Sequence, residues 1–356
     1  MNNFVKALKK AVSIIPRNVS YPTLGAVLLQ GDGKSLNIVA TNDEMSIKTT
    51  VDCSFKLDCC ANGKLLCDFL QSAKDVQLEQ EEQSLKIYSD NSELELPIFS
   101  SQEFPIVSVF NNEPTGDKIS VFASDLKDAF KKVDFVPIRD WYDSFKASVL
   151  LHYQDGLLRI AASDDQRLGV FGTLVEVREK IADRKVLISK DTVLNLEKTL
   201  PDDGEINIYF AKNGIFWEDK NGETVFTRLV NGEFPDYEKV LPKDETTYCS
   251  FEIKREEFMQ SLNRVSLIAD IAQIKARDNL EILGESEKGK IKEVVEIFDN
   301  KGNIEANYNV QYLLQPLSRM DDKTIQIKVG NYNILSFNVE QYIYVLSPVE
   351  GEGKNA

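Results

Sequence analysis

The sequence predicts an α+β protein built from three tandem copies of one unit of helices and antiparallel strands. The first observation is a short apolar alternation, Leu36-Asn37-Ile38, which recurs as Leu158-Arg159-Ile160 and Leu280-Glu281-Ile282 at two successive intervals of 122 residues. A fixed period of this kind indicates a repeated folding unit. The second observation is the length of 356 residues, which is too long for one core and suits three domains of ordinary size.

Each unit is predicted to begin with an amphipathic helix. Apolar residues at positions i, i+4 and i+7 lie on one face of a helix. The first unit has this spacing at Phe4, Leu8 and Ala11, and the other two units repeat it with Leu126, Phe130, Val133, Phe258, Leu262 and Val265. Each unit therefore opens with a helix that has one apolar face.

The rest of each unit is expected to contain a second helix and several strands. The second helices are predicted over 62–74, 189–200 and 309–320. Ser189 and Asn309 stand where N-caps are expected. Short alternating segments around the helices predict half-buried antiparallel strands, for example over 76–78, 206–208 and 325–327.

Proline and glycine clusters mark the expected domain boundaries. They lie near 105–116 and 242–247, which predicts domains over 1–114, 115–244 and 245–356. No apolar run is long enough to span a bilayer, and the start of the chain does not resemble a signal peptide, so a cytoplasmic protein without a membrane partner is expected. The five cysteines include no CxxC pair, and reduced, packed thiols are favoured over disulfides or a zinc site.

Charge is distributed unevenly along the chain. With 42 basic and 57 acidic residues the net charge is −15, which taken alone argues against a nucleic-acid ligand. The six predicted helices, however, contain 15 basic and 8 acidic residues, and the rest of the chain has a net charge of −22. Helices with a positive surface can hold a polyanion while an acidic exterior repels it elsewhere. For any single lysine, the alternative to binding a polyanion is an ordinary position on a solvent-exposed helix face. The helix ranges used are 3–17, 62–74, 123–134, 189–200, 254–268 and 309–320.

An enzymatic alternative rests on three aspartates. Asp43, Asp164 and Asp165 could serve a metal-dependent hydrolase. Neighbouring residues on a strand point to opposite faces, so Asp164 and Asp165 converge only if the chain turns there. The single histidine, His152, lies in an alternating apolar segment and is more typical of a structural strand residue than of a base. No Walker A, GxSxG, HExxH or GxGxxG motif occurs, and no catalytic residue, cofactor or metal ligand is predicted.

Six segments occur in the order typical of one bacterial family. They are Pro22–Gly25 with Val27–Leu29, Ala40–Met45, Ala162–Leu168, Phe234–Tyr237 with Val240–Pro242, Asn309–Leu314 and Tyr344–Val349. On these residues the chain resembles the DNA polymerase III beta subunit, the sliding clamp, over nearly its full length. The resemblance implies a non-catalytic processivity factor, an accessory subunit of a DNA-directed DNA polymerase in DNA replication.

The resemblance also implies an assembly. Three DNA-clamp domains in each chain of a head-to-tail homodimer would form a ring of six domains, with the helices lining a hole around double-stranded DNA. Such a ring closes when the rotations that relate each domain to the next add up to a full turn. Leu94, Leu267 and Ile268 match positions at the dimer interface, and ordinary domain core is the alternative role for each.

A clamp must hold DNA without reading its sequence, and phosphate contacts achieve this. Aromatic residues in the loop 139–145 could stack on a single-stranded template end or, alternatively, cover an apolar patch. From the charge pattern and the family positions, the expected DNA-binding residues are Lys6, Lys9, Lys10, Arg17, Asn18, Gly63, Lys64, Arg139, Trp141, Tyr142, Ser144 and Phe145.

The family also binds peptides of its partners, which include the replicative polymerase, the clamp loader and other clamp-binding proteins, in an apolar groove between the middle and last domains. This chain departs from the family pattern there. It has Asp165-Gln166 in place of Gly-His, Lys239 in place of Arg, Ser347 in place of a large apolar residue, and seven residues beyond Val349. We therefore expect a more acidic, less apolar groove with a different preferred peptide. The matching residues are Ser163, Asp165, Gln166, Arg167, Leu168, Pro235, Lys239, Val240, Val345, Leu346, Ser347, Pro348 and Val349.

Overall fold

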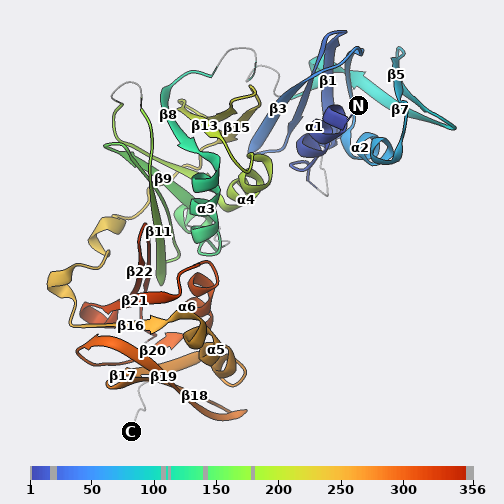
Figure 1. Ribbon diagram of the computed structural model, residues 1–356. Coiled ribbons are helices and arrows are strands. Elements are labelled where there is room, and N and C mark those ends of the chain that lie inside the picture. Colours follow the sequence, from blue (N-terminus) through green and yellow to red (C-terminus); the bar gives the residue numbers. More distant parts are fainter. Residues whose placement is uncertain are drawn as a thin grey trace. The chain divides into compact units, whose positions relative to one another are not determined.

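The computed structural model describes residues 2–16, 22–105, 110, 114–138, 143–177 and 181–349 (Figure 1). The chain divides into two compact units. Unit 1 comprises Met1–Lys127, Val175–Ala182 and Asp191–Leu229, and unit 2 comprises Asp128–Leu174, Asp183–Lys190 and Val230–Ala356. Each unit is organised by one antiparallel sheet, and the middle repeat contributes strands to both.

The sheet of unit 1 has eleven strands among the described residues, in the order β5-β6-β7-β4-β1-β2-β3-β15-β14-β13-β8. Two helices of the first repeat, α1 (Asn2–Val12) and α2 (Gly63–Ser72), contact each other and this sheet. The strands are β1 (Ala26–Asp32), β2 (Ser35–Thr41), β3 (Met45–Asp52), β4 (Lys56–Asn62), β5 (Gln77–Gln80), β6 (Ser84–Ser89), β7 (Ser92–Ser100), β8 (Asp117–Phe122), β13 (Glu205–Phe210), β14 (Gly214–Asp219) and β15 (Thr224–Arg228).

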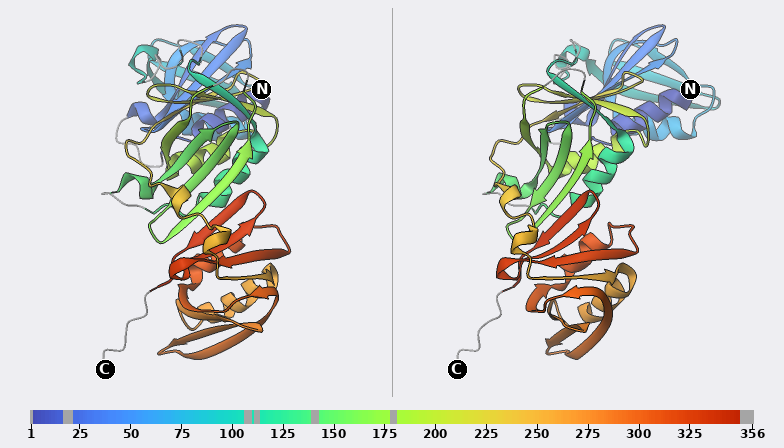
Figure 2. Two further views of the ribbon diagram at one scale, coloured as in Figure 1. Left: turned by 90° about the vertical axis from the view of Figure 1, so that its left-hand side faces the viewer. Right: turned by 60° about the vertical axis from the view of Figure 1, so that its left-hand side comes forward.

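The sheet of unit 2 has twelve strands in its described part, in the order β12-β9-β10-β11-β23-β22-β21-β16-β19-β18-β17-β20. Helices α5 (Arg255–Ser266) and α6 (Val310–Leu317) contact each other and strands of this sheet (Figure 2). The strands are β9 (Ser148–Gln154), β10 (Leu157–Ser163), β11 (Arg167–Leu174), β12 (Arg184–Ser189), β16 (Cys249–Lys254), β17 (Ile271–Ala276), β18 (Asn279–Ser286), β19 (Gly289–Lys301), β20 (Ile304–Asn309), β21 (Thr324–Val329), β22 (Leu335–Val339) and β23 (Tyr342–Leu346).

The predicted repeat is confirmed by the positions of its apolar residues. Leu36, Leu158 and Leu280 lie in β2, β10 and β18, and each is fully buried. The apolar faces of the first helix of each repeat are also buried, with every predicted side chain at most 2% exposed. The third of these helices is α5, and the second is α3 (Ala123–Val133).

The hairpin turns reveal a further element of the repeat. Asn42, Asp164 and Ser286 follow one another at the same interval of 122 residues and stand at the turns after β2, β10 and β18. Asn42 Oδ1 accepts a hydrogen bond from Glu44 N (2.9 Å), Asp164 Oδ1 from Gln166 N (3.1 Å), and Ser286 Oγ from Lys288 N (3.1 Å). Side chains that accept from the backbone two residues on stabilise tight turns. The three repeats therefore share turn chemistry as well as apolar pattern.

The predicted helices are confirmed, and two of them end three or more residues earlier than predicted. The sixth helix, α4 (Lys190–Thr199), completes the set in the described residues. Asn309 caps α6 as predicted, since its Oδ1 accepts from Tyr312 N at 3.1 Å. The first helix ends at Val12 rather than Arg17, because Pro16 cannot continue it. Helix α6 ends at Leu317, one residue after Pro316.

The cysteines are free thiols, as predicted, and four of the five are buried. Burial raises the pKa of both Cys59 and Cys60 to about 12, which keeps these thiols protonated and unreactive. None of the helices in the described ranges has both the length and the apolar character needed to cross a membrane.

Candidate nucleic-acid and partner-binding surfaces

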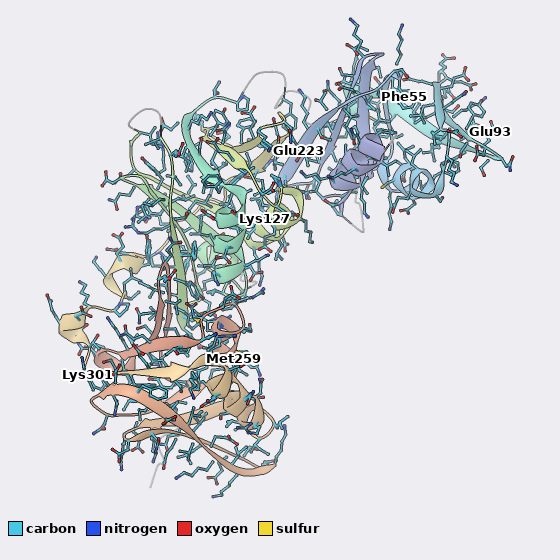
Figure 3. All side chains as sticks on the ribbon, in the orientation of Figure 1. Phe55, Glu93, Lys127, Glu223, Met259 and Lys301 are labelled. Atoms are coloured by element: carbon cyan, nitrogen blue, oxygen red, sulfur yellow. The ribbon has the colours of Figure 1, made fainter. Side chains whose placement is uncertain are left out.

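Helix α1 presents the first group of predicted DNA-binding lysines. Lys6 and Lys9 are exposed, whereas Lys10 is half-buried and forms an ion pair with Glu223. All three line a depression of about 1140 Å³ within unit 1, to which Glu223 and Lys127 also contribute (Figure 3). Burial raises the pKa of Glu223, and the neighbouring Lys10 opposes this shift. Lys6 and Lys9 are thus available to a ligand, while Lys10 has a structural partner.

The other predicted DNA-binding residues fall into three groups. Lys64 is exposed on α2, but Gly63 before it is buried, and a Cβ there would lie 2.6 Å from Val27 Cγ1. The close packing of this position against Val27 is therefore sufficient to explain why it is a glycine. Ser144 Oγ donates to Asn231 O (2.8 Å). Arg17, Asn18, Arg139, Trp141 and Tyr142 lie outside the described residues.

Phe145 belongs to an apolar cluster in unit 2. Its ring packs edge-on against Phe234, with ring centroids 6.0 Å apart. The structure therefore favours the role of Phe145 as a ring that covers an apolar patch over its role in stacking on a single-stranded template end. The cluster comprises the buried residues Leu150, Ala161, Leu168, Val170, Leu187, Tyr237 and Val345 and the partly buried Phe145, Val230, Phe234, Leu241, Ile334 and Ile343.

Strand pairing brings the two halves of the predicted peptide groove together. Strand β11 pairs with β23, which sets Leu168 opposite Val345 and Arg167 opposite Leu346. The pairing continues past the strand end, where Ser347 N donates to Gln166 O (2.8 Å). The predicted residues of the middle repeat therefore lie beside those of the last repeat within unit 2.

The remaining groove residues border this junction. Ser163 Oγ donates to Arg167 O (3.0 Å), and Val349 N donates to Asn307 O (2.8 Å). Pro348 and Val349 are half-buried, while Pro235, Lys239 and Val240 lie exposed in the segment 230–241. Lys239 forms an ion pair with Asp236 (2.8 Å), and Val240 retains 48% of its surface exposed.

Sequence reasoning missed several members of the cluster, and the sequence carried a signal for only some of them. Phe234 and Tyr237 were noticed only as a family motif. Their spacing of three residues places both rings against the cluster, at 6.1 Å from each other. Ile334 and Ile343, which come from the last repeat, carry no motif and become recognisable only through the pairing of β22 with β23.

Arg167 is the most heavily bonded side chain at this junction. Its Nε donates to Asp164 Oδ2 (2.8 Å), its Nη1 donates to Gln315 Oε1, and Nη2 donates to Phe135 O (3.3 Å). The guanidinium also lies 3.9 Å from the ring centroid of Tyr312. Both members of the ion pair with Asp164 are buried. Arg167 therefore fixes the β10–β11 turn against the last repeat rather than offering a charge to a ligand.

His152 has the structural role that its sequence predicts. It is buried in β9, and its Nδ1 lies 2.6 Å from the Tyr237 hydroxyl. Burial lowers the pKa of His152, which favours the neutral ring at physiological pH. Burial also raises the pKa of Tyr237 to about 12, so this hydrogen bond joins two neutral groups beneath the apolar cluster.

The aspartates of the hydrolase alternative do not form a reactive site. The chain does turn at Asp164 and Asp165, but Asp164 is occupied by its turn and by Arg167. Asp165 forms an ion pair with Lys146 (2.5 Å). Within the described ranges, no group of three or more His, Cys, Asp or Glu residues is placed to hold a metal ion.

The predicted dimer residues lie in two places. Leu94 is half-buried in β7 of unit 1. Leu267 and Ile268 follow α5 in unit 2, where Leu267 is 70% exposed and Ile268 is half-buried. Ile271, at the start of β17, adds a third apolar side chain with 45% exposure. A surface leucine exposed to this degree is not core, so the alternative role fails for Leu267.

Comparison with known proteins identifies the family. Profiles of the N-terminal, central and C-terminal domains of the DNA polymerase III beta subunit match residues 1–108, 121–236 and 238–342. The chain belongs to the DNA polymerase III beta subunit family. Its function is that of a beta sliding clamp, a processivity subunit of DNA polymerase III, and it is a non-catalytic accessory subunit.

Individual relatives agree with this membership. The beta sliding clamp of Pseudomonas aeruginosa is 25% identical over 349 residues, which cover 92% of this chain and 91% of the relative. That of Helicobacter pylori is 27% identical over 271 residues, covering 73% and 70%. The crystal structure of the Pseudomonas aeruginosa beta subunit superposes with a TM-score of 0.89 at 21% identity and 98% coverage of both chains. The Bacillus subtilis sliding clamp gives 0.88 at 18% identity, covering 98% of this chain and 97% of its own. The fold is the α+β, three-domain beta clamp fold.

Proposed function

We propose that two copies of this chain pair head to tail into a closed ring that encircles duplex DNA and slides along it in the cytoplasm. Each chain would contribute three clamp domains, over 1–114, 115–244 and 245–356. The exposed Leu267, together with Ile268 and Ile271, supports an interface at the surface between the end of α5 and the start of β17, and Leu94 is its proposed counterpart in unit 1. An exposed apolar group of this kind is typical of a surface covered in an oligomer.

The observation that carries the DNA-binding role is the segregation of positive charge onto helices. Lys6, Lys9 and Lys64 are exposed on α1 and α2 while the chain as a whole has a net charge of −15. Such lysines contact phosphates without reading bases, which suits a sliding protein. The ring, rather than a tight local contact, would then retain the protein on DNA.

Retention on circular DNA tests this proposal. The protein is loaded onto a nicked circular plasmid by its clamp loader, and retention is measured by gel filtration at high salt before and after the circle is linearised. We expect retention on the circle and loss on linear DNA. Retention that is equal on both would contradict encirclement. Light scattering should show a dimer, since a monomer would supply three domains and a trimer nine rather than six.

The contribution of α1 is tested by charge reversal of Lys6 and Lys9. Lys10 is spared because it pairs with Glu223. The variant Lys6→Glu/Lys9→Glu should reduce the slope of log affinity against log salt by about 2, near 0.9 per lost phosphate contact. The control Lys34→Glu/Lys56→Glu makes the same charge change at exposed residues of the β1–β2 turn and of β4 in unit 1. Equal effects of both variants would place the DNA elsewhere.

For partner binding, we propose that peptides of the polymerase, the clamp loader and other clamp-binding proteins attach beside the apolar cluster. Leu168, Val345 and Leu346 are buried and hold the junction together. The exposed Val240 and the partly buried Phe234 and Leu241 supply the apolar surface that a peptide would cover. Apolar anchors surrounded by polar groups are the usual composition of such a site.

Polymerase stimulation tests the peptide site. Val240→Lys should abolish stimulation of synthesis on a long primed template while leaving retention on circular DNA unchanged. Val294→Lys is the matched control, because Val294 is an exposed valine (56%) on β19 of the same unit. Stimulation that survives Val240→Lys, or that fails equally in the control, would show that the site is misplaced.

A further inference from the structure

Two strands of the protein have an edge that is only partly paired. Strand β7 pairs with β6 over residues 92–97, whereas on its other side it pairs with β4 only over 98–100. Strand β19 pairs with β18 over 289–296, whereas on its other side it pairs with β16 only between 297 and 301. Within the described residues, each strand therefore leaves part of one edge open. An open edge is a template for pairing with another chain.

The open edge of β7 is formed by the backbone of two glutamates. Successive residues of an antiparallel strand direct their N–H and C=O groups to opposite edges. Ile98 N donates to Gln83 O on the β6 side (3.1 Å). By this alternation Glu93 and Glu95 direct their backbone groups to the open edge, and Pro97, which has no N–H, ends the series.

The open edge of β19 is formed by the backbone of two lysines. Arg277 N donates to Asn279 O between β17 and β18 (3.1 Å), so the even-numbered residues of β18 face β19. Their partners are the odd-numbered residues of β19. The even-numbered residues of β19, among them Lys290 and Lys292, therefore direct their backbone groups to the open edge.

In unit 2 the side-chain charge alternates in sign from strand to strand up to this edge. Lys275 of β17 stands opposite Glu305 of β20 and Glu281 of β18. On β19, Lys290 and Lys292 form ion pairs with glutamates of β18 (2.6 and 2.7 Å). Lys275 thus has acidic neighbours on both adjoining strands, whereas the two lysines of β19 have them on β18 alone, because the other side is the open edge.

Unit 1 shows the same alternation and ends on the opposite sign. Lys86 of β6 stands opposite Glu79 of β5 and Glu95 of β7. It also forms an ion pair with Glu81, which follows β5 (2.6 Å). The exposed Glu93, labelled in Figure 3, and Glu95 border the open edge, and β7 contains no basic residue. A strand with lysines beyond β7 would continue the alternation, as would an acidic strand beyond β19.

From this arrangement we infer that β7 of one copy of the chain pairs with β19 of a second copy, and that the glutamates of the first edge and the lysines of the second make the two edges specific for each other. The inference rests on the proposed head-to-tail ring and adds the chemistry by which one copy recognises the next. An edge of the wrong sign would place like charges on adjoining strands and be excluded.

One antiparallel register satisfies the backbone and the charges together. It sets Glu93 opposite Lys292. Glu95 then lies opposite Lys290, and in both pairs the backbone groups face one another. Opposite charges on directly opposed residues stabilise a pair of strands. Pro97 lies opposite the turn between β18 and β19, so the pairing ends on both strands at the same point.

The side chains on the other face fit the same register. Leu94 meets Ile291, and both are half-buried in the single chain. Glu293 also lies on this face, where Arg264 forms an ion pair with it (2.5 Å). Residues 294–296 lie beside the turn that precedes β7, outside the paired segment.

Charge reversal of one edge at a time tests the inference. Glu93→Lys/Glu95→Lys makes both edges basic, and Lys290→Glu/Lys292→Glu makes both edges acidic. Each variant brings like charges together at both interfaces of a homodimer, so its dissociation constant should rise at least about 100-fold. Sedimentation velocity over a concentration series gives this constant.

A mixture of the two variants tests the pairing itself. In a mixed ring, the basic β7 edge of the first variant meets the acidic β19 edge of the second, and the two unaltered edges meet each other. We expect the mixture to recover at least about tenfold of the lost affinity. One chain with all four reversals should form homodimers again for the same reason.

Salt gives an independent readout. The dissociation constant of the wild-type dimer should rise with salt, because attraction is screened, and that of each reversed homodimer should fall, because repulsion is screened. Glu93→Gln/Glu95→Gln should weaken the dimer about tenfold and remove most of its salt dependence.

Matched controls make the same charge changes away from the open edges. Glu79→Lys/Glu82→Lys reverses two exposed glutamates of β5 and the turn after it, and Lys301→Glu/Lys323→Glu reverses two exposed lysines of unit 2. Both should leave the dissociation constant within about twofold of wild type. Thermal melting of each variant shows whether it is folded.

The outcomes separate the inference from the proposed ring. Dimers that neither reversal weakens beyond its control, or a mixture that recovers no affinity, would overturn the inference and leave the ring in place. A wild-type protein that is monomeric, or that dimerises without being retained on circular DNA, would overturn the proposed ring and the inference with it.

Discussion

Two places in the chain join one repeat to the next by extending a sheet, and they secure the extension with different side chains. At the first joint, in unit 1, β15 of the middle repeat pairs with β3 of the first. At the second joint, in unit 2, β23 of the last repeat pairs with β11 of the middle one. Both pairings are antiparallel, so the backbone contributes similarly to each.

At the first joint, polar contacts lie beside an open depression. Glu223, one residue before β15, forms its ion pair with Lys10 of α1. Arg228 N donates to Glu44 O (2.8 Å), and Thr192 Oγ1 donates to Glu44 Oε2 (3.1 Å). The depression of about 1140 Å³ adjoins the ion pair, so water has access to both charges.

The second joint is denser and carries several buried charges. Besides the contacts of Arg167 with Asp164 and α6, Arg319 forms an ion pair with Asp134 (3.2 Å), and Lys132 Nζ donates to Arg319 O. Asp134, Asp164 and Arg167 are all at most 7% exposed. The same antiparallel extension of a sheet can therefore be stabilised by a hydrated ion pair, as at the first joint, or by a network of buried charges, as at the second. The buried network stabilises the strands beside which the proposed peptide site lies.

The largest expected effect is at the second joint. Arg167→Ala leaves the Asp164 carboxylate buried without its cation and should lower the free energy of unfolding by about 3–5 kcal/mol. The measurement is urea denaturation followed by circular dichroism. The control is Arg159→Ala in β10, because Arg159 is half-buried and its side-chain contacts go to the neutral groups of Gln154 (3.5 Å) and Tyr237 rather than to a buried carboxylate. If both variants lose the same free energy of unfolding, the buried network around Arg167 stabilises the protein no more than the contacts of the half-buried Arg159.

Lys10→Met at the first joint should cost less, about 2 kcal/mol. Glu223 loses its cation but retains access to water through the depression, and its carboxyl can take up a proton. Lys9→Met is the control, since Lys9 is exposed on the same helix and should change stability by less than about 0.5 kcal/mol. A loss at Lys10 as large as that at Arg167 would show that the two joints are equally dry.

A smaller effect should appear in the pH dependence of the two joints, with the same sign in both. Burial raises the pKa of both Glu223 and Asp134 above the ordinary value of each carboxyl group. Each raised pKa means that the folded state binds the proton more tightly, so the stabilisation is complete below the ordinary value and is lost as pH rises through the folded value. Denaturation from pH 4 to 7 should therefore show wild type losing stability relative to Glu223→Gln and to Asp134→Asn. A difference that is constant with pH would contradict the raised values.

The repeat pattern explains how much of this architecture the sequence could predict. The spacing of Leu36, Leu158 and Leu280 located one buried strand in each repeat, and the helical periodicity located α1, α3 and α5, because burial imposes a period on apolar residues. The partners at the two joints have no such period. Glu223 reads as an ordinary polar residue, and Arg167 was predicted only as a residue of the peptide groove. The strand pairing brings them to Lys10 and Gln315.

The candidate sites also differ in how far the sequence could predict them, because a periodic pattern is visible in the sequence whereas contacts between distant segments are not. The exposed lysines of α1 follow from charge counting, since a helix face is visible in the sequence. The apolar cluster does not, because Phe145, Phe234, Ile334 and Ile343 come from segments nearly 200 residues apart. The family motif supplied Leu168 and Val345 but did not assign Phe145 to the cluster. For Phe145 the sequence left open a contact with DNA or the covering of an apolar patch, and the structure places its ring against Phe234.

The smallest expected effect concerns Tyr342 at the second joint. Its hydroxyl is buried and has no hydrogen-bond partner among the described residues, so Tyr342→Phe removes no hydrogen bond and should leave the melting temperature unchanged or slightly raised. Tyr308→Phe is the matched control, because the equally buried Tyr308 hydroxyl donates to Asn333 O (2.6 Å) and its loss should cost about 1 kcal/mol. If Tyr342→Phe is as costly as Tyr308→Phe, an ordered water must bond the Tyr342 hydroxyl. The second joint would then share the hydration that distinguishes the first.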